Sequence, residues 1–181
     1  VLAYTVAPLS NALREEFPLV ENATFVLNFG MLNLHSGANL IEAKYTFVDT
    51  AFFDMFSFPV IAGDPALMKK DPQQIVLAES TAKKLFGDSP AVGKDVTCQF
   101  LGQVHRYKVA AVLKVPRKSH IRFEVLLGEQ AYFEPLSWDF AEGTNVYIQL
   151  RKGSVLSDAD RKAMGRTWIN QREDGMPLEF Q

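Results

Sequence analysis

The chain has 181 residues, of which 48% are hydrophobic and 22% charged, and its 19 basic and 21 acidic side chains give a net charge of −2. This length allows one or two domains with a hydrophobic core, and the near-neutral charge excludes the strongly basic surface of a nucleic-acid-binding protein. The single cysteine, Cys98, excludes an internal disulfide. No apolar run approaches the roughly 18 residues of a membrane span, and the start at Val1 without a signal peptide predicts a processed protein or a piece of a longer one.

The first third of the chain predicts a helix followed by two strands. The apolar residues of segment 9–17 recur at the spacing of one helix face, and Pro18 ends the helix. Residues 23–29 then alternate between two faces, as in a strand, and residues 43–49 predict a second strand. A helix followed by two strands indicates an α+β fold in which helices cover a sheet.

An aromatic-rich segment comes next. Asp49 and Thr50 predict the N-cap of a short helix, and Pro59 ends this helix before a turn at 63–65. Its rings could line a ligand pocket, form an apolar surface for a partner, or form a hydrophobic core. Four phenylalanines lie within seven residues, the first three of them at helical spacing: Phe52, Phe53, Phe56 and Phe58.

The rest of the chain alternates between strands and helices. Residues 75–77 predict a short buried strand, Ser80 predicts the cap of a helix, and Gly87 ends that helix. Ser157 and Asp160 have the spacing of a capping box at the start of the last helix. The remaining predicted elements are a turn and strand at 88–100, strands at 105–116, 121–128 and 145–150, and a helix at 157–171.

The segment Gly87–Lys94 has a faint likeness to a phosphate-binding loop. Five residues instead of four separate its two glycines, and Asp95 stands where a Ser or Thr would bind magnesium. The segment also follows a helix instead of joining a strand to one. We therefore interpret it as a turn between a helix and a strand.

The other residue types that could carry chemistry do not form a site in the sequence. His35, His105 and His120 are widely separated and lack metal-ligand spacing. Cys98 lies in a predicted strand without a second cysteine nearby, which is typical of a buried, inert thiol. We predict no catalytic, cofactor-binding or metal-binding residue, and therefore no enzyme.

Four segments, taken in order, resemble one known family. They are an aromatic helix ending in a glycine turn, a strand leading into a helix that ends in Phe-Gly, a Pro-Ala-Val-Gly-Lys turn, and a strand ending in a proline followed by Ser-His. Their order and spacing are similar to those of the extracytoplasmic core domain of MacB/FtsX-type ABC transporter permeases, from about residue 9 to residue 150 or 168. The matching residues are Phe52, Phe53, Phe56 and Gly63; Ser80, Ala82, Leu85, Phe86 and Gly87; Pro90, Gly93 and Lys94; and Val109, Val112, Pro116, Ser119 and His120.

The resemblance implies an α+β fold with two subdomains. A Porter-like α/β subdomain is expected to take both ends of the chain, residues 1–48 and 116–181. A strand-rich Sabre-like subdomain is expected to be inserted between them, at residues 49–115. In a subdomain this small, the rings of the aromatic helix are expected to form the core, each contributing roughly 1.5–3 kcal/mol on burial.

The resemblance also implies a function. It is that of a non-catalytic extracytoplasmic, or periplasmic, domain of an inner (cell) membrane permease, which transmits ATP-driven motion of the membrane helices to a cargo or adaptor outside the membrane. The implied partners are a second permease copy in a homodimer, an ABC ATPase subunit or domain, and a periplasmic adaptor or a lipoprotein or peptide cargo. No cofactor and no nucleic acid are implied. The alternative function is that of an extracytoplasmic ligand-binding or sensory module.

Overall fold

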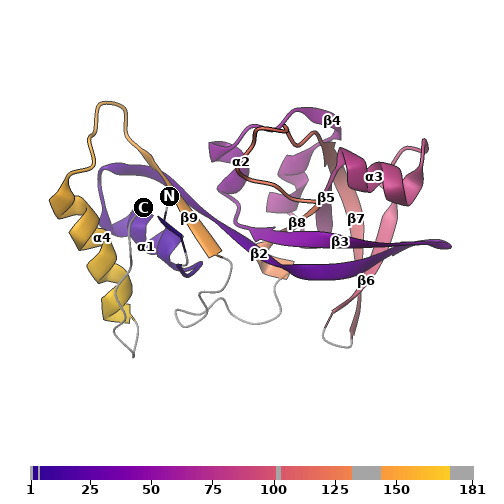
Figure 1. Ribbon diagram of the computed structural model, residues 1–181, viewed down its shortest axis with the longest axis horizontal. Coiled ribbons are helices and arrows are strands. Elements are labelled where there is room, and N and C mark those ends of the chain that lie inside the picture. Colours follow the sequence, from indigo (N-terminus) through magenta and orange to yellow (C-terminus); the bar gives the residue numbers. More distant parts are fainter. Residues whose placement is uncertain (1, 4, 101–102, 132–143, 172–181) are drawn as a thin grey trace. The chain divides into compact units, whose positions relative to one another are not determined.

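A computed structural model describes residues 2–3, 5–100, 103–131 and 144–171, and Figure 1 shows its helices and strands. The chain divides into two compact units, one made of residues 1–27 and 132–181 and the other of residues 28–131. Each unit combines helices with a sheet, which confirms the predicted α+β class.

The first unit is built from both ends of the chain. It contains β1 (Leu2–Ala3), α1 (Leu9–Glu16), the first part of β2 (Val20–Ser36), β9 (Thr144–Leu150) and α4 (Asp158–Gln171). Strand β9 is central and pairs antiparallel with both β1 and β2. Helix α1 packs against β9 and α4 and buries its leucines, as its apolar spacing predicted.

The second unit contains most of the strands. Beyond the rest of β2, its elements in chain order are β3 (Asn39–Val48), α2 (Phe52–Met55), β4 (Val60–Gly63), the 3-10 helix η1 (Pro65–Lys69), β5 (Gln74–Ala78), α3 (Glu79–Phe86), β6 (Asp95–Phe100), β7 (Gln103–Leu113), β8 (Val125–Gly128) and the 3-10 helix η2 (Glu129–Ala131).

The strands of this unit form a sheet that closes on itself. Neighbouring strands follow the order β2-β3-β8-β5-β7, and β6 pairs with both β7 and β2. Strand β4 pairs with the end of β7 that lies beyond β6. Strand β4 is therefore at the end of the strand order, with only β7 beside it among the described strands.

The centre of the second unit is covered on both faces of the sheet. Ile75, Val76 and Leu77 of β5 follow one another and are all fully buried, so both faces of this strand are packed. Helix α3 packs on β3, β5 and β7, and the Asn39 side-chain amide donates to the Leu85 carbonyl at 2.9 Å. This bond satisfies one of the carbonyls left free at the end of the helix.

The two units differ in their boundaries from the subdomains we expected at residues 49 and 115. Strand β3 ends at Val48 but runs parallel to β8, which pairs in turn with β5. Strand β8 lies after residue 115 and belongs to the same sheet. These strands join residues on both sides of the expected boundaries in the compact unit 28–131, and the division into Porter-like and Sabre-like subdomains stays a prediction. The expected first subdomain also covered residues 132–143 and 172–181, which lie outside the described residues.

Several local predictions need correction. Helix α2 has one turn with Ala51 at its N-cap, while Asp49 instead accepts a hydrogen bond from the Ala51 N–H. Helix α3 has Ala78 at its N-cap, because the helix follows β5 directly and Ser80 already lies inside it. Strand β4 was not predicted, and only the last four residues of segment 121–128 form a strand. Gly87 ends α3 at a φ of 62°, as predicted.

Candidate functional site

The aromatic segment forms a cluster of rings in the second unit. Phe52 is fully buried, and the rings of Phe53, Phe56 and Phe58 lie 5.2, 5.4 and 5.9 Å from its centre. Phe58 also meets Phe123 edge to face at 5.2 Å. Phe53, Phe56 and Phe58 are only half-buried. The core prediction is therefore right for Phe52 and wrong for Phe53 and Phe56 as fully buried residues.

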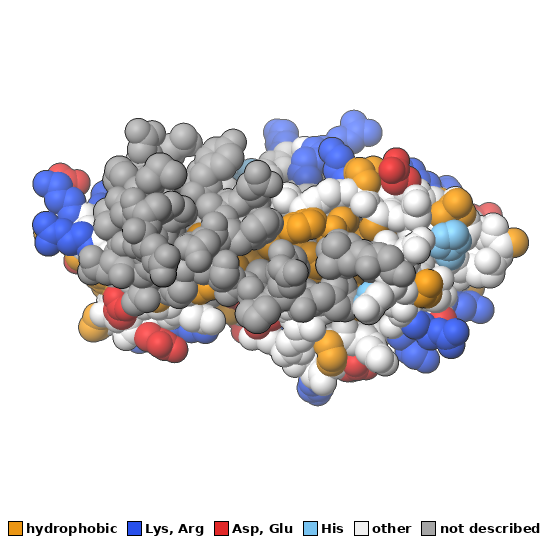
Figure 2. Space-filling view, turned by 90° about the horizontal axis from the view of Figure 1, so that it is seen from below, with side chains coloured by type: hydrophobic (Ala, Val, Ile, Leu, Met, Phe, Trp, Pro, Cys, Tyr) orange, Lys and Arg blue, Asp and Glu red, His pale blue; other side chains and the backbone are white. Residues whose placement is uncertain are grey.

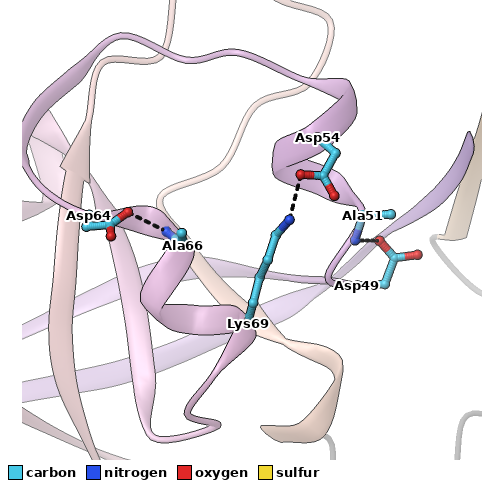
Figure 3. A network of polar contacts seen from close by, with 6 residues as sticks. All are labelled: Asp49, Ala51, Asp54, Asp64, Ala66 and Lys69. Carbon is cyan, nitrogen blue, oxygen red and sulfur yellow. Dashed lines mark hydrogen bonds and ion pairs between the residues drawn. The ribbon is translucent and has the colours of Figure 1, made fainter.

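A network of polar contacts holds α2 beside η1 (Figure 3). The Lys69 ammonium of η1 reaches Asp54 of α2, with its nitrogen 2.6 Å from a carboxylate oxygen. The Asp64 carboxylate caps η1 by accepting from the Ala66 N–H at 2.9 Å. The ion pair thus connects two short helices, which have too few residues to be stable alone. Since both partners of the ion pair are partly exposed, the pair orients the helices more than it stabilises them.

A small pocket lies beside this network. It has room for about one water molecule, so it cannot enclose a small-molecule ligand. Phe53 is the only ring of the aromatic segment that reaches it. Its lining residues are Val48, Asp49, Thr50, Phe53, Met68, Lys69, Gly128, Glu129 and Gln130.

The segment Gly87–Lys94 forms a turn that is bound to β7. The Gly93 N–H donates to the Val109 carbonyl at 2.8 Å, and the Lys94 N–H donates to Ala91 at 3.1 Å. A phosphate-binding loop needs such N–H groups to point at the ligand. Here they are already used, and the turn joins a helix to a strand, in agreement with our interpretation.

His35 and His105 lie on the two strands that flank β6, the strand of Cys98, and His35 is opposite Thr97, the neighbour of Cys98. His35 is on β2, His105 on β7, and the His120 ring meets Phe56 at 6.4 Å. Cys98 is opposite His105 across β6 and β7, a proximity that their sequence positions do not indicate. Burial raises the pKa of the Cys98 thiol to about 11, so the thiol is protonated at neutral pH and is not an activated nucleophile.

No group of three or more His, Cys, Asp or Glu side chains within the described parts of the chain could hold a metal ion. On the face of residues 28–131 seen in Figure 2, Lys and Arg side chains lie mostly toward the margins, with Asp and Glu side chains among them. Among the helices that the structure describes, none is both long and apolar enough to cross a membrane.

The sequence matches the family model of the MacB-like periplasmic core domain over residues 3–164. The chain belongs to this family, and the predicted resemblance is confirmed. It is thus an extracytoplasmic domain of the MacB/FtsX type of ABC transporter permease. Among curated proteins, none has a sequence that matches the chain.

Solved structures share the fold. A domain attributed to a permease protein of Porphyromonas gingivalis is 23% identical, with a TM-score of 0.79, covering 98% of this chain and 84% of that one. The periplasmic region of MacB from Actinobacillus actinomycetemcomitans is 14% identical, with a TM-score of 0.67 and coverage of 94% and 75%. The extracellular domain of the noncanonic ABC-type transporter YknZ, from Gram-positive bacteria, is 17% identical, with a TM-score of 0.63 and coverage of 93% and 82%.

Proposed function

We propose that this domain transmits ATP-driven motion of the membrane helices to a partner or cargo outside the membrane, and catalyses no reaction itself. The observation that carries the proposal is the family match over residues 3–164, which covers elements of both compact units. The family implies that membrane helices flank the domain in the permease. Its partners in this proposal are a second permease copy, an ABC ATPase, and an adaptor or a lipoprotein or peptide cargo.

The division of the chain supports a mechanical role. Both ends of the chain belong to the first unit, so a pull on either end acts on that unit first. Strand β2 has 17 residues and contributes to both units, pairing with β9 in the first and with β6 in the second. We propose that β2 transmits the motion from the first unit to the second. In this proposal the first unit has the role of the Porter-like subdomain, and residues 28–131 have the role of the Sabre-like subdomain.

The alternative, a ligand-binding or sensory module, has less support. The pocket beside α2 has room for only about one water molecule. A binding module of that kind would need a concave site with a volume of roughly 300–1,000 Å³.

The proposal can be tested in the full transporter by distance measurements between its two permease copies. Spin labels would be attached at Val155→Cys in the first unit and, separately, at Val104→Cys in the second, where the native side chains are 84% and 73% exposed. The native Cys98 is buried and protonated, so it should not take up label. We expect both label pairs to change distance between the nucleotide-free and ATP-bound states.

The control is a transporter whose ATPase cannot bind nucleotide, in which neither distance should change. Distances that ignore ATP but respond to a small molecule or peptide would favour the sensory module instead. Movement of the Val155 label without movement of the Val104 label would contradict transmission into the second unit.

A further inference from the structure

Strand β4 has an open edge. It pairs on one side with β7, and among the described strands none pairs with its other side. All four of its residues are exposed, including Val60 at 50% and Ile61 at 48%. The register of β4 against β7 shifts between Val60 and Ala62, at Ile61, so strict alternation of side chains does not hold there, but both Val60 and Ile61 present apolar side chains to solvent. An open, apolar edge of this kind is a template for pairing with a further strand.

Half-buried aromatic rings precede this edge in the chain. Phe58 stacks on the buried Phe52 with an interplanar angle of 16° and meets Phe123 edge to face. Phe56 also lies against Phe52, with the two rings tilted by 45° and their centres 5.4 Å apart. These rings are fixed by the core on one side and partly exposed on the other. They extend the apolar surface from β4 toward α2.

A basic loop, residues 114–122, lies directly beside β4. Its sequence KVPRKSHIR contains four Lys or Arg residues and no acidic one, although acidic residues outnumber basic ones in the whole chain. The Lys114 N–H donates to the Pro59 carbonyl at 2.9 Å, so the loop starts against the residue that precedes β4. Further along, the His120 ring meets Phe56. The loop is therefore attached at two points to the segment that contains the aromatic rings.

The cations of the basic loop are held in an ordered turn. The Ser119 N–H donates to Pro116 at 3.0 Å, which places Arg117 and Lys118 at the tip of the turn. The Arg122 guanidinium donates to the Arg117 carbonyl at 3.2 Å. All four cationic side chains are exposed, and none forms an ion pair with an acidic side chain in the described part of the chain: Lys114, Arg117, Lys118 and Arg122.

We propose that β4 binds an extended, acidic polypeptide segment of an extracytoplasmic partner as an additional strand. An added strand uses the backbone groups on the open side of β4, which a flat surface would leave without hydrogen-bond partners. Unpaired cations beside the edge select acidic residues and repel basic ones. The proposal rests on the proposed function in assuming a partner outside the membrane, and it assigns the partner's docking site to the second unit.

The test uses the isolated chain and a labelled peptide of about ten residues in which Glu alternates with Val and Thr. We expect saturable binding that weakens as salt is added. The same peptide with Lys in place of Glu should not bind. Two further peptides carry N-methyl groups on alternate residues, one in each register. Since a paired strand uses the N–H groups of one edge only, one of these two should bind and the other should not.

Matched variants locate the site. We expect Arg117→Glu with Lys118→Glu to weaken binding by at least about tenfold, while Lys152→Glu with Lys162→Glu, the same charge change on exposed residues of the first unit, has little effect. Ile61→Ser should also weaken binding, and Val104→Ser, at an exposed position on β7, should not. Circular dichroism would show that each variant is folded.

Four outcomes would overturn the proposal. They are absence of binding at about 1 mM Glu peptide, equal binding of the two N-methylated peptides, binding to phosphatidylglycerol vesicles instead of peptide through Arg117 and Lys118, and a dimer of the chain itself that Ile61→Ser dissociates. None of these results changes the spin-label distances in the transporter, so a failure here is distinguishable from a failure of the proposed function.

Discussion

Gly63, at the end of β4, is a position where a single added carbon should strongly destabilise the fold. Its φ is +81°, and a Cβ there would lie 2.1 Å from the Ala110 carbonyl oxygen of β7. The obstacle is backbone and not the end of a flexible side chain, so strand pairing would have to shift. We expect Gly63→Ala to lower the free energy of unfolding by more than about 3 kcal/mol, measured by urea denaturation.

Gly37 provides the control for this prediction. It has a φ of +59° in the turn between β2 and β3, with no heavy atom within 4 Å of a Cβ. Gly37→Ala should therefore cost only the left-handed backbone conformation, about 1–2 kcal/mol. If the two variants lost the same free energy of unfolding, the close approach of Gly63 to Ala110 would make no contribution to stability.

The cost in unfolding free energy of replacing a phenylalanine of the aromatic segment by alanine should follow how deeply its ring is buried. Phe52 is fully buried among three other rings, and Phe52→Ala should cost roughly 3–5 kcal/mol. Phe53 and Phe56 are half-buried, so we expect their alanine variants to cost about 1–2 kcal/mol each. Thermal or urea unfolding would measure all three. If Phe53→Ala lowered the free energy of unfolding as much as Phe52→Ala does, the residues around the small pocket beside α2 would be unable to rearrange into the space that the Phe53 ring leaves.

For these rings, the sequence predicts the helix that contains them but not how deeply each ring is buried. Helical spacing correctly placed Phe52, Phe53 and Phe56 in one helix, because that spacing depends only on local geometry. It could not rank their burial, because that depends on residues far along the chain: Phe56 meets His120, and Phe53 lines a pocket together with Gly128. The proximity of Cys98 and His105 likewise follows from the register of β6 and β7, which the sequence does not specify.

At the scale of elements, the capping box of α4 was predicted and is present. The Ser157 hydroxyl accepts from the Asp160 N–H at 3.1 Å, and the Asp160 carboxylate accepts from the Ser157 N–H at 2.9 Å. Ser157→Ala should cost about 1 kcal/mol of unfolding free energy at neutral pH. Lys152→Ala, in an exposed turn, is the control and should be within about 0.5 kcal/mol of the parent.

The cap should also respond to acid. Hydrogen bonds from the Ser157 side chain and backbone lower the pKa of Asp160 below its ordinary value of 3.8. A carboxyl with a depressed pKa stabilises the fold above its unfolded pKa and loses that contribution as pH falls through its folded pKa. The difference between parent and Ser157→Ala should therefore be constant near pH 7 and shrink below about pH 4. A difference that stays constant at lower pH would show that the carboxylate does not take part in the cap.

Elements with a strong local signal were predictable, and those made by pairing were not. Helix α1, the strands β3, β5 and β9 and the end of α3 at Gly87 follow from apolar spacing, β-branched residues and glycine. Strand β4 has only four residues, all exposed, so its sequence has no alternating burial pattern and it exists because β7 pairs with it. The boundaries of the second unit depend in the same way on β3 pairing with β8 across about 80 residues of chain.

At the scale of the whole molecule, the distribution of apolar surface bears on the oligomeric state. The exposed large hydrophobic residues in the described part of the chain lie on separate elements, apart from the adjacent pair on β4. They are Met31, Leu40, Val60, Ile61, Leu67, Val92, Val104 and Val155. Obligate dimers typically bury about 2,000 Å² or more of markedly apolar surface. The described residues offer no such continuous surface.

We therefore predict that the isolated domain is mostly monomeric at low micromolar concentration, although the permease is expected to function as a pair. A domain that separates from its partner copy and rejoins it in each transport cycle should bind that copy weakly. The membrane spans and the ATPase would hold the two copies at a high effective concentration and so replace intrinsic affinity. Sedimentation velocity would measure the state. A dimer that persists at this concentration would contradict the prediction, and its loss on Ile61→Ser but not on Val104→Ser would identify β4 as the missed interface.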